Sequence, residues 1–175
     1  QIVRRNELGI GTDLIASRDI QHAEHAQPAV SSVFMPTDRH FLSILIHCYN
    51  EQKNLERGVL QEVQAYLAKQ PHPWEVIIVN DESSDESRRL LQAFVAQQPG
   101  FSLFDIPHGG KPAAVWAGIQ QARAEIVLFT DMDQSTPLSE MEKLLPHYAE
   151  GADVVIGSRG GGREGFSIVR KLGSF

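Results

Sequence analysis

From Phe41 onward, short apolar runs typical of β-strands alternate with longer segments whose apolar residues recur at helical spacing. The strand-like runs cover residues 41–46, 75–79, 102–106, 125–130 and 153–156. Strands that alternate with helices predict a mainly parallel sheet with right-handed crossovers. The expected fold class is therefore α/β, with a Rossmann-like sheet flanked by helices.

Turn and capping residues set the expected boundaries of the helices. One helix, with its apolar face spread over residues 55–67, would end before Pro71. Residues 83–86 read Ser-Ser-Asp-Glu, a capping-box spacing that predicts the start of the next helix. Thr136 and Pro137 are expected to be the N-cap and the first residue of the last helix.

The length and composition indicate one globular domain with an added N-terminal segment. The chain has 175 residues, of which 42% are hydrophobic, and this is sufficient for a core. Residues 1–38 lack sustained periodicity, so we interpret them as an N-terminal arm or linker and residues 39–175 as the folded domain. The net charge of -6 argues against a nucleic-acid partner, which would need a basic surface. Cys48 is the only cysteine, so no internal disulfide can form, and we expect it to be buried.

The ends of the chain suggest a portion of a longer protein. The sequence begins at Gln1 and stops at Phe175, inside a segment that looks like the start of an amphipathic element. We therefore expect the folded domain to be truncated at its C-terminal end. No window approaches the roughly 18 apolar residues of a membrane helix, so any membrane segment would lie outside this sequence.

Two acidic loops follow strand-like runs. Asp131 and Asp133 flank Met132 directly after one run, and the loop of residues 80–85 follows another. Paired aspartates after a strand are common turn formers that cap the next element. They also suit a hard divalent cation such as Mg²⁺ or Mn²⁺, which would hold a diphosphate. The second acidic loop favours the cation site, because two such loops at two strand ends indicate one shared site.

Further polar residues belong to the same predicted edge of the sheet. The loops at Tyr49, Asp81, Lys111 and Asp131 should converge there, because each follows the carboxyl end of a strand. Asp81 would be free to accept hydrogen bonds from a base or sugar. Lys111 is either solvated or positioned to reach a phosphate, and His47 is either a buried, satisfied histidine or a neighbour of the nucleobase.

At these residues the chain resembles family 2 glycosyltransferases with the GT-A fold. The resemblance runs from about Ser43 to Arg170 and rests on the order and spacing of four motifs: the opening strand with its Tyr-Asn-Glu turn (44–51), the acidic loop (76–85), the Gly-Lys helix entry (110–119) and the Asp-Met-Asp motif (131–133). The chain departs from the family pattern at four positions: His47 where a proline or small residue is common, Asn80 where Asp is usual, and Glu82 and Pro112 where Gly is usual.

Within that family, residues 155–159 resemble the branch that transfers a sugar onto dolichyl or another polyprenyl phosphate. The resemblance implies a metal-dependent, inverting transfer of a hexose from a nucleoside diphosphate sugar, with a UDP-sugar favoured. It also implies a cytoplasmic enzyme, peripheral at the cytoplasmic face of a membrane and held there through parts outside this chain. The expected catalytic residues are Asp131, Asp133 and Arg159, and the expected metal ligands are Asp131 and Asp133. Arg159 and Arg170 are the expected ligands of the acceptor phosphate. The expected donor-binding residues are His47, Tyr49, Asn50, Glu51, Asn80, Asp81, Gly110, Lys111, Asp131, Met132 and Asp133.

Two other functions stay open on the sequence. One is a glycosyltransferase acting on a glycan hydroxyl in polysaccharide synthesis, which would need a carboxylate base beside the acceptor. The other is a nucleotide-binding module without catalysis, favoured if the departures at Asn80, Glu82 and Pro112 have altered the donor site. The identity of the sugar, the choice between UDP and GDP and the oligomeric state are not encoded in these patterns.

Overall fold

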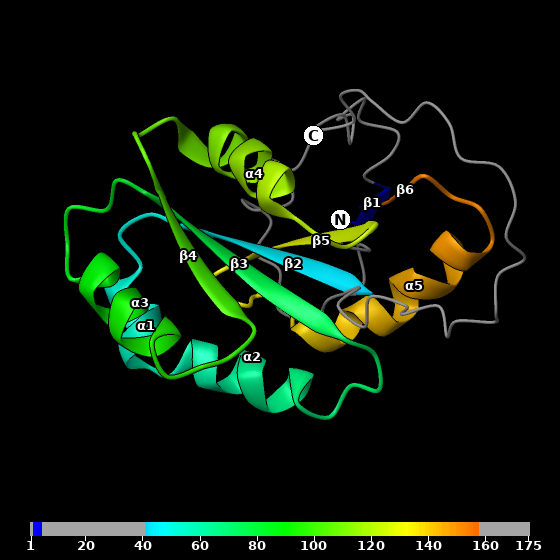
Figure 1. Ribbon diagram of the computed structural model, residues 1–175, viewed down its shortest axis with the longest axis horizontal. Helices are drawn as coiled ribbons and strands as arrows, with labels where there is room; N and C mark the ends of the chain where they lie inside the picture. The colour runs from blue at the N-terminus through cyan, green and yellow to red at the C-terminus, as the bar shows by residue number, and fades with distance from the viewer. Residues whose placement is uncertain (1, 5–40, 158–175) are drawn as a thin grey trace, which may run out of the picture.

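The protein is described by a computed structural model, which covers residues 2–4 and 41–157. These residues form a six-stranded sheet in the order β4-β3-β2-β5-β1-β6 (Figure 1). β2, β3, β4 and β5 are mutually parallel, whereas β1 pairs antiparallel with both β5 and β6. The strand bounds are β1 Ile2–Arg4, β2 Leu42–Cys48, β3 Trp74–Asp81, β4 Phe101–Ile106, β5 Ile126–Asp131 and β6 Val154–Val155.

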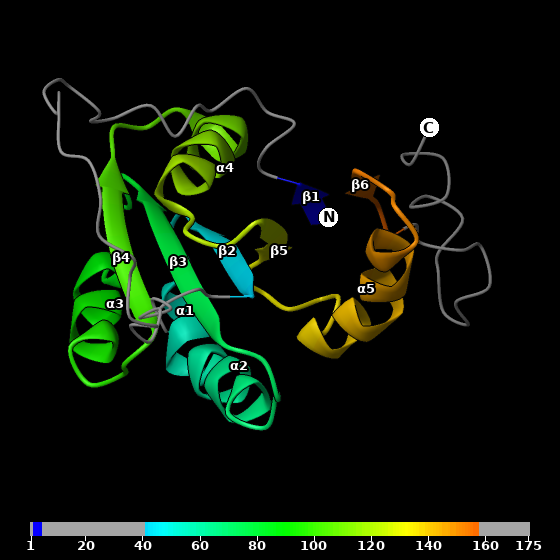
Figure 2. The same ribbon diagram turned by 45° about the vertical axis from the view of Figure 1, so that its right-hand side comes forward.

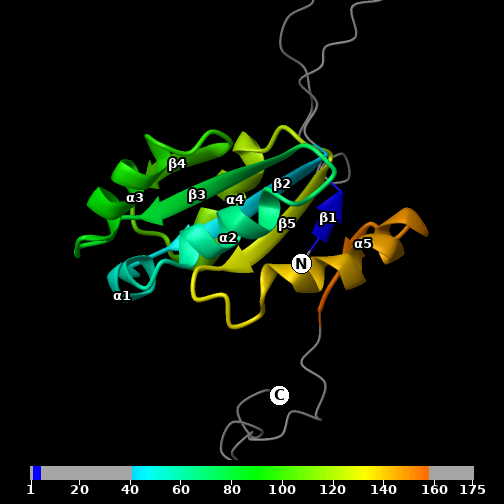
Figure 3. The same cartoon turned by 90° about the horizontal axis from the view of Figure 1, so that it is seen from below.

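Helices cover both faces of this sheet. The helix bounds are α1 Gln52–Glu56, α2 Val59–Leu67, α3 Ser87–Val95, α4 Gly110–Gln121, the 3-10 helix η2 Leu138–Glu140 and α5 Met141–Ala149. α4 packs on one face, while α1, α2 and α3 pack on the other (Figure 2). α2 and α5 lie across the face seen from below (Figure 3). The predicted α/β class, with a mainly parallel sheet flanked by helices, is confirmed.

The alternation of side chains along each strand divides the core between the two faces. Ile44 and Ile46 of β2 belong to the cluster under α1, α2, α3 and α5, whereas Leu45 packs with α4. Successive residues of a strand point to opposite faces, so a continuous apolar run is what a sheet covered on both sides requires. Cys48 is fully buried as predicted, and its burial raises the pKa of the thiol to about 11.

The first residues of the chain form part of the sheet. β1 lies between β5 and β6, with Val3 opposite Val127 on one side and Val154 on the other. No strand was predicted inside the arm of residues 1–38, because three residues are too few to show periodicity. Among residues 2–4 and 41–157, no helix is both long and apolar enough to cross a bilayer.

Three predicted helix boundaries were wrong in detail. The single helix expected over residues 55–67 is two helices, because Gly58 adopts a left-handed φ of 91° between α1 and α2. The capping box expected at residues 83–86 is absent, and Asp85 Oδ1 instead accepts a 2.9 Å bond from the Ser87 amide at the start of α3. The last helix starts later than expected, since Pro137 precedes η2 and α5 begins at Met141.

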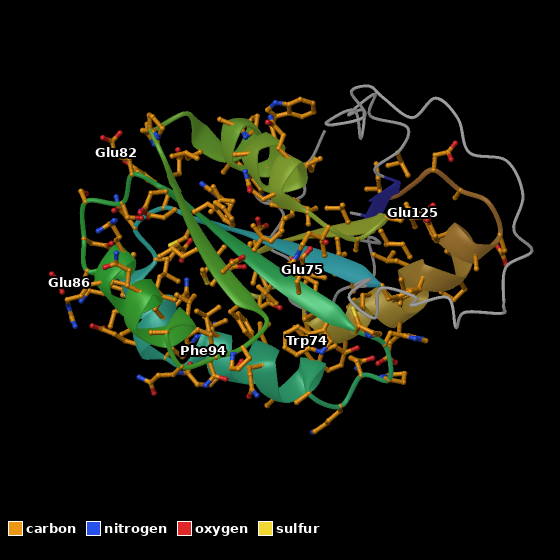
Figure 4. All side chains as sticks on the ribbon, viewed as in Figure 1. Trp74, Glu75, Glu82, Glu86, Phe94 and Glu125 are labelled. Carbon is orange, nitrogen blue, oxygen red and sulfur yellow. The ribbon has the colours of Figure 1, made fainter. Side chains whose placement is uncertain are left out.

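A buried polar network ties the amino ends of β2 and β3 to the start of β5. Glu75 lies at the amino end of β3, next to Trp74 (Figure 4), and is 3% exposed. Its carboxylate accepts hydrogen bonds from Ser43 Oγ at 2.6 Å and from Arg123 N and Nε at 2.7 and 2.8 Å. Burial alone would raise the pKa of Glu75, but these hydrogen bonds and the Arg123 charge outweigh it and lower the pKa. The carboxylate is therefore retained as a satisfied anion.

Gly118 allows α4 to approach the sheet closely. A Cβ at this position would lie 3.0 Å from Leu45 Cδ2 and 3.3 Å from Val79 Cγ2. Both neighbours are buried strand residues, so they have little room to move. This contact fixes the height of α4 over the sheet and with it the position of Lys111 in the first turn.

We expect Gly118→Val to lower the free energy of unfolding by about 1–3 kcal/mol, because the added side chain overpacks the α4–sheet contact. Urea denaturation measures this change. The control is Gln120→Val on the exposed side of the same helix, which should cost only about 0.5 kcal/mol through helix propensity. Equal losses in the two variants would contradict the close-approach interpretation.

Candidate functional site

Three loops at the carboxyl ends of β2, β3 and β5 each contain a residue in a left-handed conformation. Asn50, Glu82 and Gln134 have φ of 54°, 55° and 49°, and no other non-glycine residue in the described part of the chain has a positive φ. Such conformations are uncommon outside glycine and persist where surrounding bonds hold them. Their clustering at one edge of the sheet marks that edge as the candidate site.

Hydrogen bonds lock the first two loops together. Asn50 Oδ1 accepts from the amides of Ser84 at 2.8 Å and Asp85 at 3.3 Å, and the Asn50 amide donates to Ser83 Oγ at 3.0 Å. The Glu51 amide donates to Ser87 Oγ at 2.8 Å. Asn50 and Glu51 therefore build the site wall in this structure, and their predicted contacts with the donor stay predictions.

Asp81 joins the end of β3 to the beginning of α4. Its Oδ1 accepts a 2.8 Å bond from the Gly109 amide and its Oδ2 accepts a 2.9 Å bond from the Gly110 amide. A carboxylate at this place complements the positive end of the helix and satisfies amides that have no intrahelical partner. Asp81 is 0% exposed. Both oxygens thus already have one backbone donor each, and the expectation that Asp81 accepts hydrogen bonds from a base or sugar stays a prediction.

Two histidines flank the Asp81 carboxylate. His108 Nδ1 lies 3.1 Å from Asp81 Oδ2, and His47 Nε2 lies 3.5 Å from the same oxygen. His47 Nε2 is buried and makes no well-aligned hydrogen bond. Burial alone would raise the pKa of Asp81, but the Gly109 amide, the His108 charge, His47 and the Gly110 amide together lower it. The His108 ring also contacts the ring of Tyr49, with centroids 4.6 Å apart, and Tyr49 is 41% exposed at the rim.

The structure gives a physical reason for two departures from the family pattern. Asn80 is buried, donates from Nδ2 to Asp105 Oδ1 at 2.8 Å and accepts from the Ser83 amide at 3.3 Å. Glu82, at the tip of the loop after β3 (Figure 4), occupies a left-handed position that favours glycine. Its Oε2 accepts a 2.9 Å bond from the His108 amide, which helps to hold the loop.

The Asp131-Met132-Asp133 segment begins at the last residue of β5. Asp131 Oδ1 lies 2.5 Å from Lys111 Nζ, and both side chains are nearly half exposed. Asp133 Oδ1 accepts a 2.9 Å bond from the Ser135 amide. Met132 is 2% exposed and packs in the core, so its predicted donor contact would have to come from its backbone.

Two further residues support this segment. Arg57 Nη2 donates to the Asp133 carbonyl at 3.1 Å, and Gln134 Nε2 donates to the Asp131 carbonyl at 2.7 Å. The sequence alone does not indicate Arg57 and His108, because each acts through contacts between loops far apart in sequence, and it does not indicate Gln134, which acts within its own loop. For Arg57 the sequence offers only a cation inside a predicted helix, and this signal is too common to be diagnostic.

The predicted site residues converge in part. His47 lies opposite Asp131 in the β2–β5 register, Lys111 contacts Asp131 directly, and Asp81 contacts Gly110. β2 is followed by β3 and β4 on one side, and the chain then returns through α4 to β5 on the other side. The convergence therefore lies at a topological switch point, where open α/β sheets bind ligands. Arg159 and Arg170 lie outside the described residues.

The carboxylate oxygens at this edge of the sheet are ligands that suit a hard divalent cation. Asp131 and Asp133 offer carboxylate oxygens, and an ammonium group already occupies the position beside Asp131. Within residues 2–4 and 41–157, no group of three or more His, Cys, Asp or Glu side chains is arranged to hold a metal. Mg²⁺ typically takes only one or two protein carboxylates and completes its shell with phosphates and water, so two aspartates suffice.

A cavity of about 510 Å³ opens beside Asp131, between β5, η2 and α5. Its volume is in the range of small-molecule sites. The lining includes Lys111, Phe129, Asp131, Thr136, Leu144 and Ile156.

Comparison with known proteins gives the family. Residues 43–172, more than half of the chain, match the family described as "Glycosyl transferase family 2". The chain therefore belongs to glycosyl transferase family 2, and this confirms the family predicted from the four motifs.

Two curated relatives are similar to this chain. The chain is 32% identical over 132 residues to the dolichyl-phosphate beta-glucosyltransferase ALG5D of Trichomonas vaginalis, covering 68% of this chain and 39% of that protein. It is 33% identical over 136 residues to the undecaprenyl-phosphate 4-deoxy-4-formamido-L-arabinose transferase of Pectobacterium carotovorum, covering 76% and 40%. The chain thus spans about two fifths of the length of these relatives.

A solved structure is also similar. The mannosyltransferase PcManGT from Pyrobaculum calidifontis, in complex with GDP-Man and Mn2+, matches at 25% identity and a TM-score of 0.49, covering 61% of this chain and 31% of that one.

We expect Asp81→Asn to lower the free energy of unfolding by about 1–3 kcal/mol, because one amide at the start of α4 loses its acceptor. The lowered pKa of Asp81 means that its contribution is complete above pH 3.8 and is lost as the pH falls through the folded-state pKa. Urea denaturation near neutral pH and below pH 3.8 measures both effects. The variant should lose part of the acid sensitivity of the wild type.

Asp153→Asn is the control for this prediction, since Asp153 is exposed at the surface. It should leave both the stability and the acid dependence unchanged. If Asp81→Asn behaved like this control, the carboxylate would not be anchoring α4.

Proposed function

We propose that this chain carries the donor site of a metal-dependent inverting glycosyltransferase that moves a hexose from a nucleoside diphosphate sugar to a polyprenyl phosphate. A UDP-sugar is the favoured donor, on the family resemblance. The observation that carries the proposal is the half-exposed Asp131 carboxylate at the switch point of the sheet, facing a cation from α4. Family membership supports the reaction class.

The residues of the donor site would have separate roles. Asp131 and Asp133 would hold the metal, and Lys111 would contact a phosphate of the donor. Tyr49 offers an exposed ring at the rim, beside His108, on which a nucleobase can stack. Asp81, His47, Asn50 and Asn80 would keep the surrounding loops in place. When bound, a Mg²⁺ or Mn²⁺ ion supplies Lewis-acid stabilisation of the diphosphate leaving group.

The names of the curated relatives support a lipid phosphate as the acceptor rather than a glycan hydroxyl. Both relatives described above are named for dolichyl or undecaprenyl phosphate. Arg159 and Arg170 would hold this phosphate, because guanidinium groups suit bidentate phosphate recognition. A phosphate is already ionised near neutral pH, so the transfer needs no dedicated general base. We propose a peripheral position at the cytoplasmic face of the membrane, where such an acceptor is reached.

We expect Asp133→Ala to abolish manganese-dependent binding of UDP, because one of the two proposed metal ligands is removed. Calorimetry with UDP, GDP and UDP-glucose, each with and without Mn²⁺, measures this binding and also selects the nucleotide. Asp153→Ala serves as the control and should bind like the wild type. Unchanged UDP affinity in Asp133→Ala would refute the metal role of Asp133.

We expect Arg159→Ala to spare donor binding and to weaken use of the acceptor. The loss of one charged phosphate contact should lower transfer to undecaprenyl phosphate by about tenfold or more. Transfer is measured with a radiolabelled sugar donor, and calorimetry with UDP and Mn²⁺ checks the donor site in the same preparation. If transfer to the lipid were unchanged, Arg159 would not contact the acceptor phosphate.

A further inference from the structure

Lys111 occupies the side of Asp131 where the proposed metal would bind. The side chain leaves the first turn of α4, and its Nζ lies 2.5 Å from Asp131 Oδ1 and 4.9 Å from the centroid of the Phe129 ring. Both contacts are with residues of β5. The ammonium group is thus held from two directions, by a carboxylate and by the face of an aromatic ring.

We propose that Lys111 competes with the divalent cation for Asp131, so that the metal binds together with the diphosphate and not before it. This inference rests on the proposed function, and it assigns Lys111 a second role that a phosphate ligand alone does not have. In the absence of the donor, Lys111 neutralises Asp131. When a diphosphate arrives, Lys111 transfers to a phosphate oxygen and leaves Asp131 to the metal.

The electrostatics of the edge support this exchange. A cation entering beside Asp131 meets a carboxylate whose charge is already compensated, and it must displace or repel the ammonium group. Arg57 places a second positive charge at the carbonyl of Asp133. The approach of a free dication is therefore opposed on both sides of the Asp131-Met132-Asp133 segment. A nucleoside diphosphate reverses the balance, because its negative charges attract both the lysine and the metal.

The small number of protein ligands is an independent argument for joint binding. No third carboxylate, histidine or cysteine joins Asp131 and Asp133 within the described ranges 2–4 and 41–157. The shell of a bound Mg²⁺ or Mn²⁺ must then be completed by phosphate oxygens and water. A metal that needs the phosphates of the donor gains little from binding first. Binding of the metal and of the nucleotide should consequently be coupled, each raising the affinity of the other by the same factor.

The test compares the binding of Mn²⁺ alone with its binding in the presence of saturating UDP, measured through the electron paramagnetic resonance signal of free Mn²⁺. Lys111→Met removes the charge but keeps a long apolar stem against Phe129. We expect this variant to bind Mn²⁺ alone about three- to tenfold more tightly than the wild type, since the repulsion is gone. It should bind UDP less tightly, so the enhancement of Mn²⁺ affinity by UDP should fall.

Two control variants separate competition from a general loss of structure. Lys143→Met removes another lysine that lines the same cavity but pairs with Glu140 at 2.8 Å, and it should leave both affinities unchanged. Lys111→Arg keeps the positive charge and should keep the weak binding of Mn²⁺ alone. Circular dichroism melting curves confirm that each variant is folded. A damaged fold would weaken both ligands, whereas competition predicts opposite changes for Mn²⁺ and UDP.

The outcomes distinguish this inference from the proposed function. If wild type binds Mn²⁺ jointly with UDP or GDP but Lys111→Met leaves the affinity for Mn²⁺ alone unchanged or lower, the competition is overturned and the donor site stands. If wild type binds neither nucleotide with Mn²⁺, both proposals are overturned. The exchange would be supported if Lys111→Met, and neither control variant, bound Mn²⁺ more tightly and showed a smaller enhancement of Mn²⁺ affinity by UDP.

Discussion

The buried carboxylate of Asp81 is the interaction on which the arrangement of the site depends. It connects the end of a central strand to the amides of the N-cap Gly109 and of Gly110, the first residue of α4, and these amides have no acceptor within the helix. The position of α4 in turn sets where Lys111 begins, and the side chain of Lys111 then reaches Asp131 at the end of β5. The Asp81 carboxylate therefore links the ends of β3 and β5 through α4, and Gly118 completes the link by letting that helix approach the sheet.

The interlocking of the loops divides the polar residues of this edge into two groups. Asn50, Asn80 and Asp81 form hydrogen bonds with neighbouring backbone and side chains. Tyr49, Lys111 and Asp131 remain substantially exposed, so they are the groups that a ligand can reach. A rigid wall of satisfied polar groups that carries a few accessible ones is how a site is pre-organised without the free energy cost of many unpaired buried atoms.

The sequence predicted the fold well because strand and helix periods alternate cleanly from Phe41 onward. It also predicted which loops meet, since parallel strands bring their carboxyl ends to one edge. It failed where a single residue or a long-range contact decides the outcome. The break at Gly58 interrupts a continuous apolar pattern, and the burial of Asp81 depends on the placement of α4. The roles of Arg57 and His108 depend on loops that only the folded chain brings together.

The departures from the family pattern bear on whether this edge can still hold a donor. Pro112 is the third residue of α4, where the missing amide would have had no intrahelical acceptor, so the helix loses no hydrogen bond. Glu82 keeps the left-handed backbone that glycine would adopt, and it adds a hydrogen bond to the His108 amide. Asn80 is tied to Asp105 and to the Ser83 amide. Each substitution is accommodated locally by the contacts that it makes. This weighs against the interpretation of the chain as a degenerate module whose donor edge has collapsed.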